Sequence, residues 1–351
     1  MASPSVQDAL SQDADIANHQ PLVSVIIPVF NDAQRLRTCL AALMNQTYPP
    51  SRYEIIVVDN GSEPSQQAAA VVAAVTAEQV SKLAVGTGLV RDIRVSKASP
   101  AAELSPSILT AYESVPGSYA ARNRGLSLAR GEVIAFTDAD CIPAPDWLAE
   151  GVQVLTRNPN CGLVAGAVQL FFRNPKRPTM VELYESVTAL QKREFVERHH
   201  YGATANVFTT RQVIEQVGGF DAELKARGDV EWGQRVYAHG YQQIYAESVV
   251  VHHPARASLR ELYIRTCRLA GGVYDLQRQQ TKSVWQRQLV FGRSLGQDLV
   301  PPVFFVINTF LDPGLKGVGQ KLKVSWVMVM VRCISAWEKV RLKLGGTSSR
   351  L

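Results

Sequence analysis

The stretch EVIAFTDADC, residues 132–141, decides the fold of this chain. Its first six residues form an apolar run whose length is typical of a strand buried on both faces of a sheet. Two carboxylates, Asp138 and Asp140, follow the run with one alanine between them. An Asp-x-Asp pair in a solvated turn is common, whereas a pair placed directly after a buried strand indicates a ligand site at the end of that strand.

Two similar runs lie upstream. VSVIIPVF, residues 23–30, and EIIVVDNGS, residues 54–62, predict two more buried strands. Residues 33–45 between them carry leucines at helical spacing, and Asn31 and Asp32 are residue types that suit a helix cap. A strand, a helix and a strand in this order predict a right-handed βαβ unit with a parallel sheet.

The same alternation continues along the chain. We expect helices over residues 63–82 and 120–129 and strands over 108–113 and 244–251. These elements predict an α/β fold with a mostly parallel central sheet flanked by helices. The expected organisation is a disordered lead-in over 1–20, an α/β domain over 21–255 with an insertion at 84–106, and a basic helical extension over 256–351.

Polar side chains follow three of the predicted strands: Asn31, Asp59, and the pair Asp138 and Asp140. Parallel strands end at one edge of their sheet, so we expect these side chains to lie close together. Two neighbouring carboxylates repel unless a cation lies between them. Oxygen ligands of this kind suit Mg²⁺ or Mn²⁺, so the residues point to a divalent metal at this edge.

Four segments resemble, in this order, the successive motifs of the family 2 glycosyltransferases with the GT-A fold: VSVIIPVFN, EIIVVDNGS, YAARNRGLSLARGEVIAFTDADC and GGFDAELKARGDVEWGQRV. The resemblance covers residues 22–255. It implies transfer of a sugar from a nucleotide-diphospho-sugar, a UDP-sugar by family default, to a hydroxyl of a glycan or lipid-linked acceptor. It further implies a metal-assisted inverting displacement, in cell-surface or extracellular polysaccharide biosynthesis.

The resemblance also implies roles for single residues on the donor side. Pro28 and Asn31 would flank the nucleoside, and Asp59 would bind the base or the ribose. Arg122 would lie near the nucleotide. Asp138 would contact the nucleotide sugar, and Asp140 would ligate the Mn²⁺ or Mg²⁺. A surface cation on a helix is the alternative for Arg122.

Downstream, Asp229 matches the family's general base, with Glu231 and Trp232 in the donor site. The family commonly has Glu where this chain has Gly228. A capped helix start is the structural alternative for Asp229 and Glu231. His253, just before a proline, resembles a further metal ligand. The segment GATAN, residues 202–206, resembles the loop beneath the donor sugar or the acceptor.

The C-terminal region has a different charge. Residues 255–351 contain 16 Lys and Arg against 5 Asp and Glu, whereas residues 1–254 contain 21 against 26. A helix expected over 321–344 places four cations on one arc, opposite an apolar side with Trp326 and Trp337: Lys321, Arg332, Lys339 and Lys343. Such a helix either makes peripheral contact with an anionic membrane or packs on the domain. Because these tryptophans lie on the apolar side, we expect no nucleic-acid partner.

The five cysteines are widely spaced and form no Cys-x-x-Cys pair, which argues against a disulfide framework and a zinc site. With the polar, acidic start of the chain, this pattern predicts a cytoplasmic protein. Two other functions remain open. A sugar-phosphate nucleotidyltransferase would have a glycine-rich loop where this chain has VFNDAQRLR, and a non-catalytic nucleotide-sugar-binding relative would not need Asp138, Asp140 and Asp229.

Overall fold

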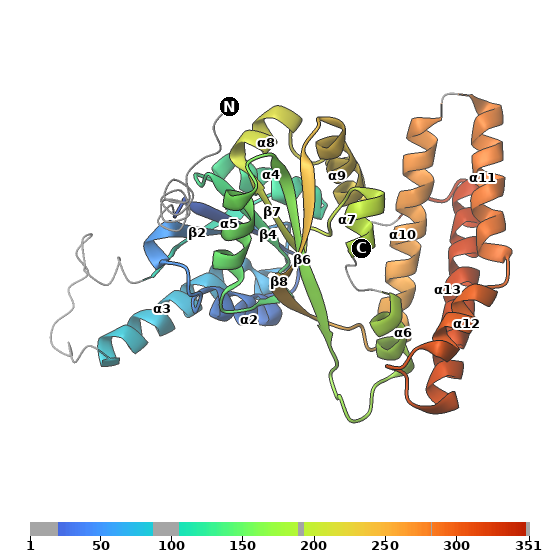
Figure 1. The fold of residues 1–351 in the computed structure, drawn as a ribbon, viewed down its shortest axis with the longest axis horizontal. Helices are drawn as coiled ribbons and strands as arrows, with labels where there is room; N and C mark the ends of the chain where they lie inside the picture. The colour runs from blue at the N-terminus through green and yellow to red at the C-terminus, as the bar shows by residue number, and fades with distance from the viewer. Residues whose placement is uncertain (1–19, 87–104, 189–192, 282, 349–351) are drawn as a thin grey trace, which may run out of the picture. The chain divides into compact units, whose positions relative to one another are not determined.

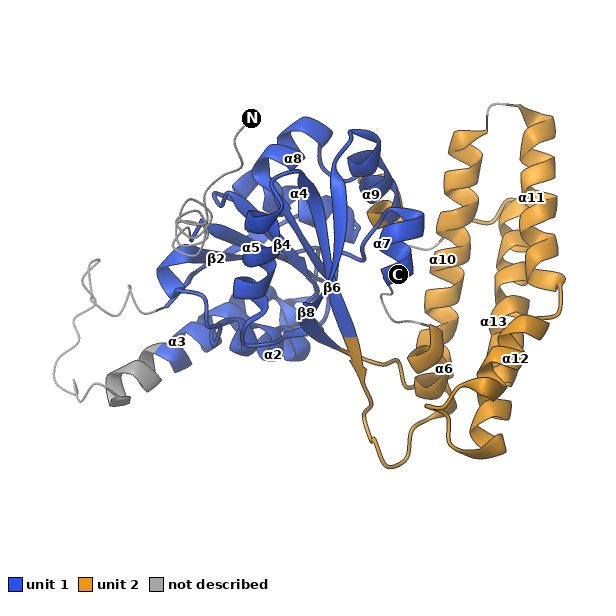
Figure 2. Cartoon of the chain, viewed as in Figure 1, with its two compact units in different colours: residues 1–168, 191–220, 230–252 blue, residues 169–190, 221–229, 253–351 orange. Residues whose placement is uncertain are grey.

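The computed structural model describes residues 20–86, 105–188, 193–281 and 283–348, and its chain forms two compact units (Figure 2). The first unit contains residues 1–168, 191–220 and 230–252, and the second contains 169–190, 221–229 and 253–351. The expected boundary near residue 255 lies close to the last of these divisions. The second unit, however, also takes in two earlier segments. The expected lead-in and most of the expected insertion lie outside the described residues.

The first unit is built on one eight-stranded sheet with helices on both faces (Figure 1). Its strands are β1 (Val23–Val29), β2 (Tyr53–Asp59), β3 (Ser107–Tyr112), β4 (Val133–Thr137), β5 (Ile142–Pro143), β6 (Cys161–Phe171), β7 (Asn206–Thr210) and β8 (Gln242–Pro254). Its helices are α2 (Ala33–Leu43), α3 (Ala68–Gly86), α4 (Ser118–Leu128), α5 (Trp147–Arg157), α7 (Arg193–His199), α8 (Arg211–Val217) and α9 (Gly228–Ala238), with 3₁₀ turns η1 (Pro50–Arg52) and η2 (Pro64–Gln66).

The strand order is β3-β2-β1-β4-β7-β6-β8-β5. Strands β3, β2, β1 and β4 run parallel, as the βαβ pattern predicts. The pairs β4–β7, β7–β6 and β8–β5 are antiparallel, so the parallel arrangement describes only the N-terminal half of a mixed sheet. The α/β class, with helices flanking the sheet, is confirmed.

Alternate residues of β1 pack into different cores. Val25 and Ile27 belong to the cluster that also contains Leu40 of α2 and Trp147 of α5. Ile26 lies on the opposite face beneath α4, where a side chain added at Gly125 would meet the Ile26 side chain at 2.4 Å. Because both faces are covered, the strand is apolar throughout, which explains the uninterrupted run in the sequence.

Asn206 at the start of β7 joins three elements of this core. Its Nδ2 donates to the carbonyls of Ala167 in β6 and Val249 in β8, both at 2.9 Å. Its Oδ1 accepts from the indole N–H of Trp147 in α5 at 2.8 Å. The side chain is fully buried, so each of these bonds satisfies a group that water cannot reach.

We expect Asn206→Ala to lower the free energy of unfolding by about 3 kcal/mol or more, because it leaves a buried indole N–H and two buried carbonyls short of a partner. Asn45→Ala is the matched control. Asn45 is exposed and bonds only locally to the Ala41 carbonyl, so its loss should cost roughly 0.5 kcal/mol or less. Urea unfolding followed by circular dichroism measures both variants, and equal midpoints would contradict a structural role for Asn206.

The second unit is helical. Its helices are α6 (Met180–Thr188), α10 (Leu259–Gln280), α11 (Val284–Leu299), α12 (Val303–Leu311) and α13 (Gly317–Lys343). Helix α10 begins with a capping box between Ser258 and Glu261, a pattern that satisfies two N-terminal amides. Val324 and Val327 of α13 are buried with Leu183 of α6 and Leu262 of α10, which forms the core of this unit.

Three of the four cations predicted to line one arc of α13 bond to neighbouring helices, and the fourth, Lys343, lies over the Phe291 ring of α11. Lys321 donates to the Phe310 carbonyl of α12, and Arg332 donates to the Gln297 carbonyl of α11 at 3.0 Å. Lys339 is buried and lies 2.6 Å from the Asp298 carboxylate. The cations share one arc of the helix, as predicted. Three of them bind groups near the C-terminal ends of α11 and α12, where the helix dipole favours a positive charge.

None of the helices in the described ranges is both long and apolar enough to cross a bilayer.

Candidate active site

The carboxyl ends of β1 and β2 carry two of the predicted donor-site residues, Asn31 and Asp59. Strand pairing places Val29 opposite Asp59. Both carboxylate oxygens of Asp59 accept backbone amides at 2.8 Å, from Ser62 and Ala68. Asn31 has a positive φ of 49° and accepts from the Glu63 amide at 2.8 Å. Both side chains thus shape the loop that follows β2 at the ligand edge of the sheet. Pro28 precedes them as a half-buried residue of β1.

Arg122 and Asp138 form an ion pair at the end of β4. The Nη2 of Arg122 lies 2.5 Å from Oδ1 of Asp138, and the arginine side chain is 3 % exposed. The guanidinium carbon lies 5.8 Å from the ring centre of Tyr119. Among the described residues, its Nε is buried without a hydrogen-bond partner. Arg122 is therefore not the surface cation considered as the alternative, and it fixes one carboxylate of the Asp-x-Asp pair.

The other carboxylate, Asp140, faces a cation that the sequence analysis did not single out. Arg35 of α2 lies 3.2 Å from the Asp32 carboxylate and 3.9 Å from that of Asp140. Burial and the negative charge of Asp140 raise the pKa of Asp32, and the Arg35 charge opposes that rise. Asp32 stands at the N-cap position of α2, as expected, but its carboxylate pairs with Arg35. The edge is thus a concentration of negative charge, partly compensated by Arg35 and Arg122.

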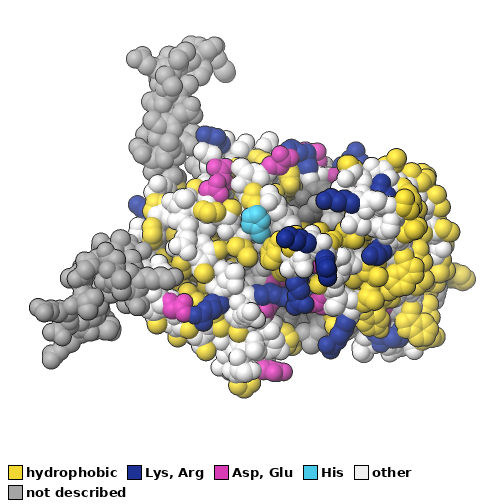
Figure 3. All heavy atoms as spheres, turned by 90° about the horizontal axis from the view of Figure 1, so that it is seen from below, with side chains coloured by type: hydrophobic (Ala, Val, Ile, Leu, Met, Phe, Trp, Pro, Cys, Tyr) yellow, Lys and Arg dark blue, Asp and Glu magenta, His cyan; other side chains and the backbone are white. Residues whose placement is uncertain are grey.

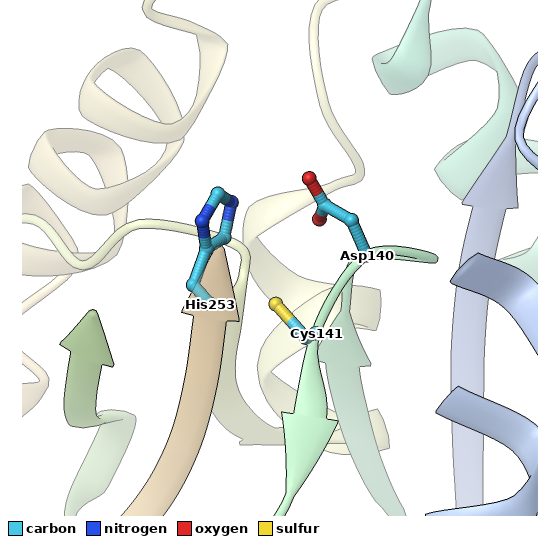
Figure 4. Close-up of side chains that lie close together, drawn as sticks. All are labelled: Asp140, Cys141 and His253. Atoms are coloured by element: carbon cyan, nitrogen blue, oxygen red, sulfur yellow. The ribbon is translucent and has the colours of Figure 1, made fainter. Parts of the chain in front are cut away.

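Strand pairing brings His253 to Asp140, although the two are far apart in sequence. Strand β8 runs through the division between the units, and its His252 pairs with Ile142 of β5. The next residue, His253, has a ring nitrogen within 4.8 Å of a ligand atom of both Asp140 and Cys141 (Figure 4). Figure 4 shows the imidazole and the carboxylate at the ends of neighbouring strands.

These side chains fit a divalent metal. The Nδ1 of His253 lies 2.8 Å from the Pro254 carbonyl, which can only accept, so the proton belongs on Nδ1 and the lone pair on Nε2. A carboxylate and an imidazole suit Mn²⁺ better than Mg²⁺, which prefers oxygen. Burial, with the nearby charges of Asp138 and Asp140, raises the pKa of Cys141 well above its usual range. Burial therefore favours the neutral thiol of Cys141 in this environment.

Helix α9 presents Glu231 and Trp232, which were assigned to the donor site. Glu231 holds Arg235 at 2.8 and 2.9 Å, and Arg235 donates to the carbonyls of Val217 and Gly219. Trp232 is 1 % exposed, and its indole N–H donates to the Gly218 carbonyl at 3.0 Å. Both side chains therefore anchor the segment after α8, and their contact with a donor stays a prediction.

The indole of Trp232 also packs in an aromatic cluster below the end of β4. Its ring centre lies 5.2 Å from that of Phe220 and 6.5 Å from that of Phe136. Phe136 is the residue of β4 two positions before Asp138. Aromatic packing of this kind stabilises the strand end from which Asp138 and Asp140 project.

Asp229 lies in the first turn of α9, after Gly228 and after Arg227, whose φ is 64°. A carboxylate in the first turn of a helix suits the helix dipole, and the assignment of Asp229 as the base stays a prediction. In the segment GATAN, Asn206 has the structural role described above. Arg35 was not predicted to be part of the site. Its spacing of three residues from Asp32 on one helix was the available signal.

A family model described as "Glycosyltransferase like family 2" matches residues 19–272. The chain belongs to this family. Glycosyltransferase AglE of Haloferax volcanii is 34 % identical to it over 244 residues, which cover 67 % of this chain and 68 % of AglE. A probable glucomannan 4-beta-mannosyltransferase of Arabidopsis thaliana is 23 % identical over 86 % of this chain and 51 % of its own length.

This family 2 glycosyltransferase also has a solved structural relative. The mannosyltransferase PcManGT of Pyrobaculum calidifontis, in complex with GDP-Man and Mn²⁺, superposes with a TM-score of 0.56 at 18 % identity, covering 93 % of this chain and 89 % of its own. The superposition confirms the GT-A fold. The family match and the similarity to AglE identify the chain as a glycosyltransferase.

Proposed function

We propose that this glycosyltransferase moves a sugar from a nucleotide-diphospho-sugar to a hydroxyl of a glycan or lipid-linked acceptor, with metal assistance and inversion at the anomeric carbon. One observation carries the proposal: Asp138 and Asp140 leave β4 at the ligand edge of the sheet, where strand pairing adds His253 next to Asp140. An acidic pair with an imidazole beside it suits a cation that in turn holds a diphosphate.

In this proposal each end of the donor meets a different group of side chains. Asn31 and Asp59, with Pro28 before them, line the edge of the sheet where the nucleoside binds. Arg122 holds Asp138 in place for contact with the nucleotide sugar. Asp140 and His253 would hold Mn²⁺ or Mg²⁺, which would supply positive charge to stabilise the departing diphosphate. Glu231 and Trp232 support the site by anchoring the segment after α8.

Asp229 has the role of general base. An inverting transfer needs a carboxylate that takes the proton of the acceptor hydroxyl while its oxygen attacks the anomeric carbon. The anomeric carbon–oxygen bond to the diphosphate breaks on the opposite side, and the diphosphate leaves with the bonding electrons. Asp229 is proposed for this step because it matches the family's base and stands in a helical first turn, where backbone amides favour a negative charge.

The donor is proposed to be a UDP- or a GDP-sugar. UDP is the default of the family, whereas PcManGT binds GDP-Man. All five cysteines lie in the described part of the chain as free thiols, which supports a reducing, cytoplasmic site of action. A cytoplasmic enzyme with a lipid-linked acceptor fits polysaccharide biosynthesis for the cell surface.

A thermal-shift screen tests the proposal. We expect UDP- or GDP-sugars to raise the melting temperature in the presence of Mn²⁺ and to act much more weakly when EDTA replaces the metal. A donor at a hundred times its Kd stabilises the folded state by about 2.7 kcal/mol, which is readily detected. If no nucleotide sugar shifts the melting temperature with or without metal, the proposed donor site is wrong.

A further inference from the structure

The C-terminal helix α13 exposes a continuous apolar stripe. Val318, Leu322, Trp326, Val329 and Trp337 recur at spacings that place them on one side of the helix. Trp326 is 55 % exposed and Trp337 is 65 % exposed. The helix has 27 residues, so it is about 40 Å long. The opposite side of the helix packs in the core of the second unit. The exposed stripe therefore takes no part in that core.

Helices α11 and α12 add to the exposed apolar surface. Phe304 of α12 is 84 % exposed, and Trp285 of α11 is 82 % exposed. We call this set of side chains the helical apolar face: Trp285, Leu289, Leu299, Val303, Phe304, Ile307 and Leu311, with the five residues of the α13 stripe. Figure 3 shows hydrophobic side chains gathered densely on one side of the surface. Contiguous apolar surface of this extent marks an interaction site.

The aromatic residues of the face indicate the kind of partner. The chain has five tryptophans, of which Trp147 and Trp232 are buried in the first unit. The other three, Trp285, Trp326 and Trp337, are exposed on α11 and α13. Tryptophan is enriched where protein meets the boundary between lipid headgroups and acyl chains, because its ring is apolar while its N–H remains polar.

The net charge of the C-terminal helices favours a membrane over a second copy of the chain as the partner of this face. Residues 283–348 contain nine Lys and Arg against three Asp and Glu. Two of these acids are paired within the unit, Asp298 with Lys339 and Glu338 with Arg341. The exposed cations of this segment are Arg293, Lys316, Lys323 and Lys343. A symmetric dimer through the face would bring like charges together, whereas an anionic lipid surface attracts them.

A basic cavity beside the face offers a place for a headgroup. It has a volume of about 380 Å³ and lies between α10, α11 and the end of α13. Three cations line it: Arg278, Arg287 and Lys343. Val284 also lines it and is itself 68 % exposed, next in sequence to Trp285. A guanidinium group can donate two parallel hydrogen bonds to the oxygens of one phosphate. The cavity therefore suits a phosphate that adjoins an apolar surface.

We propose that the helical apolar face docks on a membrane containing anionic phospholipids, with the cavity receiving a lipid phosphate. The three outward tryptophans lie among the acyl chains and headgroups, and the exposed cations meet the negative surface. Docking is separate from the transfer chemistry proposed above because it needs neither donor nor acceptor. A failure of either proposal leaves the other standing.

Co-sedimentation with vesicles tests the proposal on the full chain. We expect binding to phosphatidylcholine vesicles that contain phosphatidylglycerol, at least about tenfold weaker binding to phosphatidylcholine alone, and weakening by added salt. The double variant Phe304→Glu, Trp326→Glu should bind roughly tenfold less or worse. Leu109→Glu is the matched control, since Leu109 is an exposed apolar residue on β3, and it should bind like the wild type. Circular dichroism confirms that the variants are folded.

Tryptophan fluorescence gives a second measurement. Brominated acyl chains in the vesicles should quench the three exposed tryptophans and leave the emission of Trp147 and Trp232 unaffected. Arg278→Gln combined with Lys343→Gln should reduce the preference for phosphatidylglycerol while quenching persists. Unquenched wild-type protein, or unchanged binding of the double glutamate variant, would overturn the proposal. So would light scattering that finds a dimer dissociated by the same glutamates, because the face would then join two copies.

Discussion

Replacing Asp140 with alanine is expected to abolish sugar transfer, with a loss in kcat/KM on the order of 10³-fold or more. Asp140 is the carboxylate that lies with His253 in a group able to hold a metal, whereas Asp138 forms an ion pair with Arg122. The loss should appear in transfer and in slow donor hydrolysis alike. The Mn²⁺-dependent part of the donor-induced thermal shift should disappear with it.

Asp146→Ala is the matched control for this change. Asp146 follows Asp140 by six residues and is exposed at the N-terminus of α5. Its loss removes one negative charge without touching the cluster of Asp140, Cys141 and His253. We expect near wild-type transfer from this variant. Full activity of Asp140→Ala would show that the metal assignment is wrong, even if other carboxylates of the site proved essential.

Asp229→Asn is expected to bind the donor normally and to lose transfer by roughly 10²- to 10⁴-fold in kcat. The amide keeps the size and most of the hydrogen bonding of the carboxylate but cannot accept the acceptor's proton. Steady-state transfer measures the loss, and isothermal titration with the donor and Mn²⁺ measures the binding. The two measurements separate a base from a donor ligand, because only a ligand would change the Kd.

Glu223→Gln provides the control in the same segment. Glu223 is exposed six residues before Asp229, so the variant removes an equal charge at a neighbouring surface position. It should keep both donor binding and transfer. Loss of donor binding in Asp229→Asn, with Glu223→Gln unaffected, would mean that Asp229 holds the donor. Intact transfer in Asp229→Asn would remove it from the reaction altogether.

The local pattern of apolar and polar residues predicted the strands in the first half of the fold closely. The run VSVIIPVF became β1, residues 23–29, and EVIAFT became β4, residues 133–137. Each of these strands is covered on both faces, so its burial leaves an uninterrupted apolar signal. Helix α3 begins at Ala68, later than expected, because Pro64 opens a separate 3₁₀ turn before it.

The antiparallel half of the sheet was not predictable in the same way. Strand β7 enters between β4 and β6, and its register with β4 depends on residues far away along the chain. Hydrophobic periodicity identifies a strand but carries no information on its neighbours or its direction. Asn206 illustrates the limit, because the motif GATAN indicated proximity to the site, while its three buried hydrogen bonds reveal a structural tie.

The cations of α13 give a second example of what the sequence pattern cannot predict. Their helical spacing predicted that they share an arc, and three of them turn toward α11 and α12. Helical spacing shows which residues share one side of a helix. It does not show whether that side faces solvent or a neighbouring helix. Here the apolar stripe with Trp326 and Trp337 faces outward, while these three cations contact neighbouring helices.

The sequence by itself determined which strands are buried and which residues are candidates for the site, because both follow from residue type and near neighbours. Asp138 and Asp140 were assigned to a strand end at the ligand edge on that basis alone. The tertiary structure decided their partners: Arg122 for Asp138, and Arg35 and His253 for Asp140. Those pairings depend on how α2, α4 and β8 meet the end of β4, and contacts between distant segments form only when the whole sheet does.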